Sequence, residues 1–127
     1  DKITALCRQA VGTMLNFTLQ HVGLPCGSAD AAASTARAIC RLFGLEYRQG
    51  NTSDFAVPFV ECCKAELPGT HGHIAIGTPD VERAEFHLGL QGTEFLEHTR
   101  KVDDKGRTKA IYLNQTFAGF AVHLMRK

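Results

Sequence analysis

The chain has 127 residues, of which 44% are hydrophobic and 21% charged, and its formal net charge is +1. This length can bury one hydrophobic core and favours one domain over two. The small net charge excludes the basic surface typical of proteins that bind nucleic acid or anionic membranes. No apolar run is long enough to cross a bilayer, and no signal-peptide pattern opens the chain, so we expect a soluble protein. The odd number of cysteines without C-x-x-C spacing favours reduced thiols and therefore a cytoplasmic location.

Apolar residues at helical spacing open the chain. They recur on one face of residues 1–16 as Ile3, Leu6, Cys7, Ala10, Val11 and Met14. This spacing predicts an amphipathic helix whose apolar face must pack on something. Since the first residue is Asp1 and not Met, we interpret the sequence as a piece of a longer protein or a processed one.

A strand, a helix and further strands are predicted next. Residues 17–25 have the composition of a strand, and the loop at residues 27–30 supplies the N-cap of an alanine-rich helix that ends before Gly44. The predicted buried face of this helix consists of Ala32, Ala36, Ile39, Cys40 and Phe43. Strands are expected at about residues 46–49 and 54–64, before a turn at Pro68 and Gly69.

The same order of elements then repeats. Residues 71–77 are predicted to form a strand, followed by a helix that is capped by Asp80 and ends before Gly92. The remaining strands are predicted at residues 95–102, 109–114 and 119–126. The short segments HVGL and HIAI correspond in the two halves, as do GLEY and GTEF. The chain is therefore predicted to be two βαβββ modules, at about residues 17–67 and 70–127, preceded by one helix.

Strand alternation identifies the candidate site. In the first strand of each module the aliphatic residues share one face, so His21 and His73 lie on the other, beside the small residues Gly23 and Ala75. An ionisable residue occupies the corresponding side of the first and last strands of both modules: His21, Glu61, His73 and His123. Packing of the modules around a pseudo-twofold axis would bring all four together. Three imidazoles and one carboxylate suit a divalent ion such as Zn, Ni, Co, Mn or Fe(II).

The other histidines and the cysteines have simpler interpretations. His71 shares parity with His73 but lies at the mouth of the strand, so we expect it at the rim of the pocket or in support of a ligand. We expect His87 and His98 on the surface. The five cysteines lack metal-site spacing and are predicted to be reduced, small fillers of the core: Cys7, Cys26, Cys40, Cys62 and Cys63. The last two are adjacent, so their side chains point to opposite faces of a strand.

Residues 17–127 resemble the vicinal oxygen chelate superfamily, which includes glyoxalase I and bleomycin-resistance proteins. The likeness rests on LQHVGL with His21, FVECCK with Glu61, GHIAIGTPD with His73 and FAVHLM with His123. It implies an α+β fold in which two βαβββ modules form a curved mixed sheet, with these four residues as ligands of a divalent metal. One departure is that glyoxalase I has a glutamate as its closing ligand where this sequence has His123.

A second resemblance covers the first sixteen residues. DKITALCRQAV is similar to the last helix of bacterial 2-keto-3-deoxy-6-phosphogluconate / 4-hydroxy-2-oxoglutarate aldolases, some of which carry a glyoxalase-like module at their C-terminus. FAVHLMRK and the pattern DxKGxxKAIYL also resemble that appended module. This implies that residues 1–16 are the end of an upstream aldolase domain. The Schiff-base lysine of such an aldolase would lie upstream of this sequence.

The resemblance to the superfamily implies proton-transfer chemistry. We expect a metal-dependent lyase or isomerase that acts on a small 2-oxo acid or 2-oxo aldehyde, with Glu61 as the ligand that detaches and serves as the base. The alternative is a non-catalytic module that binds a small molecule and regulates the aldolase. An extradiol-type dioxygenase would need a carboxylate at His123, and metal-free sequestration of a bleomycin-type molecule would leave four ligands unexplained. We also expect a homodimer, because the first helix offers an apolar face.

Overall fold

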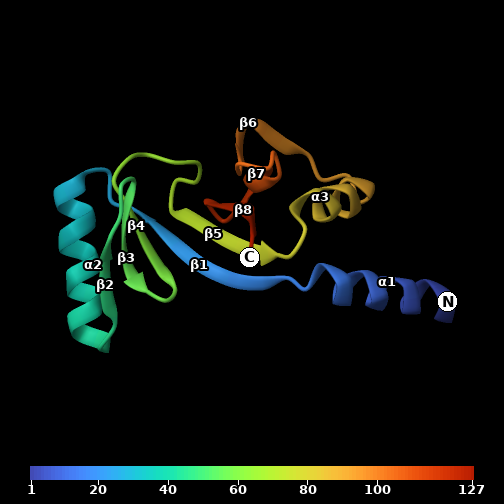
Figure 1. The fold of residues 1–127 in the computed structure, drawn as a ribbon, viewed down its shortest axis with the longest axis horizontal. Coiled ribbons are helices and arrows are strands. Elements are labelled where there is room, and N and C mark those ends of the chain that lie inside the picture. The colour runs from blue at the N-terminus through green and yellow to red at the C-terminus, as the bar shows by residue number, and fades with distance from the viewer. The chain divides into compact units, whose positions relative to one another are not determined.

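The computed structural model describes residues 1–127 and contains three helices and eight strands (Figure 1). In chain order the elements are α1 (Lys2–Leu15), β1 (Thr18–Pro25), α2 (Ala29–Phe43), β2 (Glu46–Gln49), β3 (Ser53–Val57), β4 (Val60–Cys63), β5 (Gly72–Thr78), α3 (Val81–Leu90), β6 (Phe95–Val102), β7 (Thr108–Phe117) and β8 (Phe120–Arg126). None of the helices is long and apolar enough to cross a membrane.

The eight strands form one mixed sheet in the order β2-β3-β4-β1-β5-β8-β7-β6. β1 pairs in parallel with β4. The other pairs are antiparallel: β2 with β3, β3 with β4, and β6 with β7. In each module the first strand is therefore the neighbour of the last strand, and the second strand is at the edge. The predicted α+β fold of two βαβββ modules after an N-terminal helix is confirmed.

The helix boundaries follow from local capping chemistry. The Ser28 side chain accepts a hydrogen bond from the backbone N–H of Ala31 at the start of α2, and Asp80 accepts one from Arg83 at the start of α3. α2 ends at Gly44, whose φ of 66° is left-handed and favours glycine. The capping residues expected from the sequence, in the loop before α2 and at Asp80, are thus confirmed.

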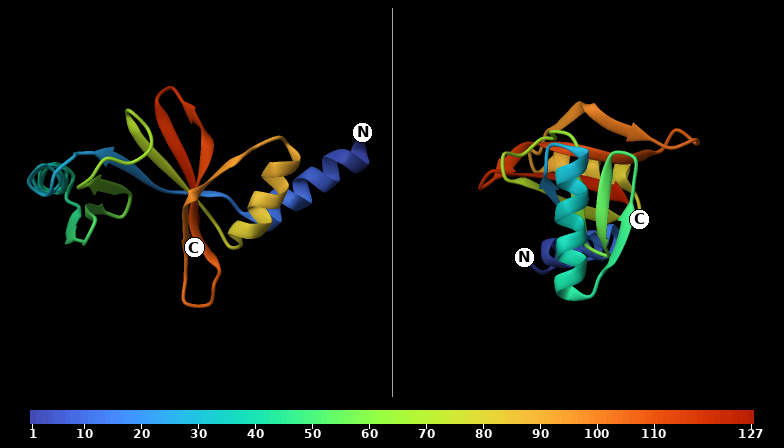
Figure 2. Two further views of the ribbon diagram at one scale, coloured as in Figure 1. Left: turned by 90° about the horizontal axis from the view of Figure 1, so that it is seen from above. Right: turned by 90° about the vertical axis from the view of Figure 1, so that its left-hand side faces the viewer.

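The chain divides into two compact units that do not coincide with the two modules. One unit consists of Gln20–Ala75 and Gln115–Val122. In it α2 packs along β2, β3 and β4, as Figure 2 shows. Its core is made of small residues, Ala32, Ala36 and Cys62, against which Leu24 and Val60 also pack. The aliphatic faces of β1 and β4 thus lie under α2, as the alternation of the sequence predicts.

The other unit consists of Asp1–Leu19, Ile76–Asn114 and His123–Lys127. Its core has larger side chains: Leu15, Val81, Ala84, Ile111 and Leu124. Ile76 packs against this cluster, as predicted for the aliphatic face of β5. The hydroxyl of Thr78 donates to the carbonyl of Leu15 over 2.7 Å and fixes the end of α1 to the end of β5.

Three details of the prediction are wrong. Residues 54–64 form two antiparallel strands and not one, because Pro58 has no N–H to donate to a sheet ladder and lies in the turn between β3 and β4. Phe43 is 71% exposed, since the buried stripe of α2 ends at Cys40, one turn before the helix does. Cys7 is exposed on α1, whose only buried residue is Leu15, so it fills no core in this chain.

Candidate metal centre

Parallel pairing of β1 with β4 brings the first two candidate ligands together. In this register Gly23 lies opposite Glu61, so His21 and Glu61 occupy neighbouring strands on the same side of the sheet. The distance from His21 Nε2 to Glu61 Oε2 is 2.9 Å, and the two side chains are 17% and 16% exposed. Two residues forty positions apart in the sequence therefore share a partly buried polar site.

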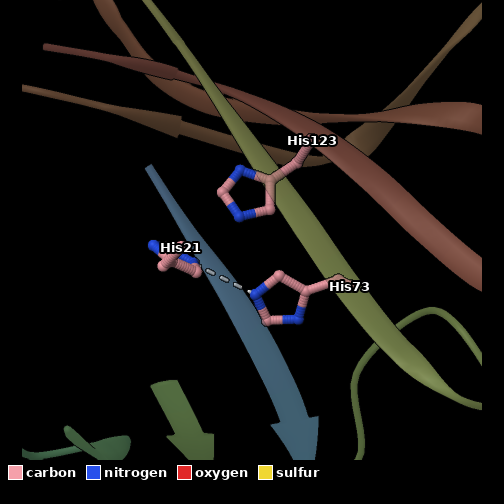
Figure 3. Close-up of side chains that lie close together, drawn as sticks. All are labelled: His21, His73 and His123. Atoms are coloured by element: carbon pink, nitrogen blue, oxygen red, sulfur yellow. Dashed lines mark hydrogen bonds between the residues drawn. The ribbon is translucent and has the colours of Figure 1, made fainter. Parts of the chain in front are cut away.

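His73, on β5, contributes a second imidazole and is only 2% exposed. Its Nε2 lies 3.0 Å from Glu61 Oε2 and 3.2 Å from His21 Nε2, the contact drawn as a dashed line in Figure 3. The ring occupies the space that a side chain on Gly23 would need, because a Cβ built there overlaps the imidazole. The expectation that small residues leave room around the histidines is confirmed at Gly23.

Two of these three contacts share one carboxylate oxygen, and the third joins the two imidazole nitrogens. His21 Nε2, His73 Nε2 and Glu61 Oε2 form a triangle with sides of 2.9, 3.0 and 3.2 Å. Ligand atoms about 2.1 Å from a metal ion and at right angles to one another are about 3.0 Å apart. The three atoms thus have the spacing of one face of an octahedral coordination sphere, and the residues fit a divalent ion.

The environment keeps Glu61 ionised. Burial by itself raises the pKa of this carboxyl group, but hydrogen bonds from His21 and His73 and the charge of His21 have the larger opposite effect. A hydrogen bond from Ser53 acts in the same direction. The resulting pKa lies well below its ordinary value, so the group is a carboxylate, which is the form that binds a metal ion.

His123 lies on β8 and is buried, with 7% of its surface exposed. Its Nδ1 lies 3.1 Å from the carbonyl oxygen of Leu124, and because a carbonyl oxygen only accepts, Nδ1 is the donor. In the neutral ring this leaves the lone pair on Nε2. His123 belongs to the other compact unit than His21 and His73, so its place among the ligands stays a prediction from the sequence.

The remaining histidines are not part of these contacts. His71 is exposed, and its Nδ1 donates to the carbonyl of Ala118 over 2.9 Å, so it holds the β7–β8 turn. His98 is exposed as predicted, but His87 is half-buried and lines a groove between α1 and α3. The prediction for His87 is therefore wrong in detail, because the end of α1 covers part of that helix surface.

Sequence reasoning missed two residues beside the ligands. Cys63 is buried and offers a sulfur within 4.8 Å of ligand atoms of Glu61 and His73. Ser53 is 3% exposed and hydrogen-bonds with both Glu61 and Cys63. The signal for Cys63 was present, since it lies two residues from Glu61 on one strand and so faces the same side. Ser53 could not be found in this way, because its position depends on the pairing of β3 with β4.

Two βαβββ modules joined in one mixed sheet give the chain a glyoxalase-like fold. Among solved structures, a hypothetical protein from Bacillus halodurans C-125 matches with a TM-score of 0.62 and 15% identity, over 87% of this chain and 94% of the other. A methylmalonyl-CoA epimerase from Streptomyces coelicolor, in complex with 2-nitronate-propionyl-CoA, matches with a TM-score of 0.56 and 16% identity over the same shares.

Another methylmalonyl-CoA epimerase structure matches with a TM-score of 0.59 and 14% identity, over 85% of this chain and 93% of the other. No family model matches the sequence, and no curated protein matches it. At these identities the comparisons show a shared fold, which confirms the predicted architecture. The chemistry of this chain has to be argued from its own residues.

Proposed function

We propose that this chain holds a divalent metal ion through His21, Glu61, His73 and His123 and catalyses a proton transfer of the isomerase or lyase type. The observation that carries the proposal is the convergence of two imidazole nitrogens and one carboxylate oxygen within 3.2 Å. Buried polar groups are arranged in this way when they bind an ion or form a catalytic network. Zn, Ni, Co, Mn and Fe(II) all accept this ligand set.

The proposed substrate is a small 2-oxo acid or 2-oxo aldehyde. When bound, the ion would polarise two adjacent substrate oxygens and stabilise the negative charge that develops on them. Glu61 is the proposed base: the C–H bond next to the carbonyl breaks, the proton passes to the carboxylate, and the electron pair moves towards the carbonyl oxygen. Return of the proton to the other face or to another atom completes an epimerisation or an isomerisation.

The similar structures support this class of reaction. Two of them are methylmalonyl-CoA epimerases, enzymes whose name specifies inversion at a carbon next to a carbonyl group. The same elementary step, removal and return of a proton next to a carbonyl, would serve a 2-oxo acid. A CoA thioester therefore belongs in the panel of compounds to be tested beside the oxo acids and aldehydes.

A cleft at the end of β1 offers room for a small substrate. It has a volume of about 580 Å³ and is lined by residues 25–27, at the end of β1, and by part of the loop at residues 66–70. Pro25 is the register partner of Cys63, two pairs along from Gly23 and Glu61. The cleft thus begins on the strand that carries His21.

The test has two stages. Protein purified without added metal is first analysed for bound elements, and one divalent ion per chain is expected. Wild-type protein is then incubated in D₂O with pyruvate, methylglyoxal or methylmalonyl-CoA, and exchange next to the carbonyl is followed by NMR. Glu61→Gln should retain at least part of the metal and lower the exchange rate by about two to four orders of magnitude, the range for loss of a general base.

Glu46→Gln is the matched control, because Glu46 is an exposed glutamate on the edge strand β2. It should exchange at the wild-type rate. Equal rates in Glu61→Gln and wild type would contradict the role of Glu61. A metal-loaded protein that promotes no exchange on any compound would favour the alternative function, a module that binds and senses a small molecule.

Two further points are proposals about the parent protein. The apolar face of α1 supports attachment to another body, since Ile3 and Leu6 are 74% and 64% exposed. The similarity of this helix to the last helix of an aldolase would make that body an upstream aldolase domain. In a homodimer, a second copy of the chain would cover the same face instead. Sedimentation of the isolated chain distinguishes the two: a dimer is expected if a second copy covers the face, and a monomer if an upstream domain does.

A further inference from the structure

Two adjacent cysteines on β4 have opposite surroundings. Cys62 faces α2 and packs against Ala32 and Ala36 in the core. Cys63 faces the other side of the sheet, as Glu61 does, and is 2% exposed. The two thiols are neighbours in the sequence, but only the Cys63 thiol lies on the side of the sheet that carries the polar residues of the metal centre.

Cys63 belongs to a second group of possible ligands, which shares Glu61 and His73 with the four residues of the proposed centre. The sulfur of Cys63, a carboxylate oxygen of Glu61 and a ring nitrogen of His73 all lie within 4.8 Å of one another. Register explains how the three meet: Gly23 and Pro25 of β1 lie opposite Glu61 and Cys63. Because Gly23 has no side chain, the His73 ring lies over β1 and reaches the residues of β4.

Ser53 adds a contact that a plain core cysteine would not need. It is the register partner of Cys63 on β3, and its hydroxyl hydrogen-bonds with both Cys63 and Glu61. A serine hydroxyl has one hydrogen and two lone pairs, so it can donate to the Glu61 carboxylate and accept from the Cys63 S–H, which ties both groups to one place. Hydrogen bonds of this kind orient metal ligands.

We propose that Cys63 is a further ligand of the same ion, so that the centre selects a thiophilic metal such as Zn or Co over Mn. This inference rests on the metal centre of the proposed function and adds a ligand to it. As the sulfur–metal bond forms, the S–H bond breaks and its proton leaves to solvent. Thiolate ligands favour zinc and cobalt, whereas a set of nitrogen and oxygen ligands alone also suits manganese.

The experiment uses one equivalent of Co(II) as the probe. A cobalt–thiolate bond gives an intense charge-transfer band in the near ultraviolet, which imidazole and carboxylate ligands do not produce. All samples carry Cys7→Ser, because Cys7 is exposed and could bind cobalt on its own. The band is expected in this background and in Cys62→Ala, the matched control, and it should be lost in Cys63→Ala and Cys63→Ser. Competition between Zn and Mn should shift towards Mn in the Cys63 variants only.

The outcomes separate this inference from the proposed function. Cobalt bound without the charge-transfer band, or a band that persists in both Cys63 variants, overturns the role of Cys63 and leaves the four-ligand centre standing. Failure to bind cobalt, zinc or manganese at all overturns both. Absence of the band in the Cys7→Ser protein overturns the inference whether or not the Cys63 variants fold, and a band that is present is assigned to Cys63 by its loss in those variants and its survival in Cys62→Ala.

Discussion

The two modules have the same strand order but differ in the size of the side chains that they bury. In the first module α2 covers a core of Ala32, Ala36 and Cys62, whereas the second module buries Val81, Ile111 and Leu124. On the side of the candidate site the first module again has the smaller residue, because it has Gly23 where the second has Ala75. The fold thus tolerates changes of side-chain volume under its helices, but the space around His73 requires the smallest residue at one position.

The largest expected effect tests the asymmetry of the two cores. Leu124→Ala should lower the free energy of unfolding by about 2–5 kcal/mol, because the leucine is 2% exposed and its loss leaves a cavity. Cys62→Ala removes a single sulfur from the smaller core and should cost about 1 kcal/mol. Urea unfolding measures both, and equal losses would contradict the view that the second module has the stronger core.

The next effect tests the asymmetry between Gly23 and Ala75. Gly23→Ala places a Cβ in the space of the His73 ring, so we expect a loss of about 1–3 kcal/mol from overpacking together with loss of the bound metal. Ala75→Gly only adds backbone freedom and should cost about 0.5–1 kcal/mol with the metal retained. Metal analysis of the two folded variants distinguishes them, and a metal-loaded Gly23→Ala protein would refute the packing argument.

The smallest effect concerns a carboxylate of the second module. Although partial burial raises it, donation from the Thr108 N–H and pairing with Arg126 lower the pKa of Glu82 to about 2 from an ordinary 4.5. A lowered pKa contributes stability above pH 4.5 that is lost as the pH falls from there towards 2. Because Glu82 is 48% exposed, we expect less than about 1 kcal/mol.

Glu82→Gln should flatten the pH dependence of the unfolding free energy in that window, which urea titrations at pH 5 and pH 3 would measure. The first module offers the comparison in Asp54, whose pKa is also lowered but which is 2% exposed and accepts hydrogen bonds from Tyr47 and Gly50. Asp54→Asn should therefore reduce stability at neutral pH more than Glu82→Gln does. A larger loss in Glu82→Gln would contradict the expectation that the buried carboxylate of Asp54 contributes more to stability than the exposed one of Glu82.

Local patterns in the sequence were sufficient for most of the fold. Alternation on β1 and β4 predicted which residues lie under α2, and capping residues predicted where α2 and α3 begin. The errors arose where burial depends on a neighbour, as at Phe43, or where an amide donor is missing, as at Pro58. Periodicity assigns a face to a residue, but it does not say whether another element covers that face.

The sequence by itself determined the repeated modules, the strand faces and the candidacy of His21, Glu61, His73 and His123, because all of these follow from spacing along the chain. Only the tertiary structure decided that Glu61 Oε2 meets two imidazole nitrogens, that the His73 ring lies over Gly23, and that Cys63 and Ser53 border the same centre. Those relations depend on strand register and on distances between residues remote in sequence, which no local pattern encodes.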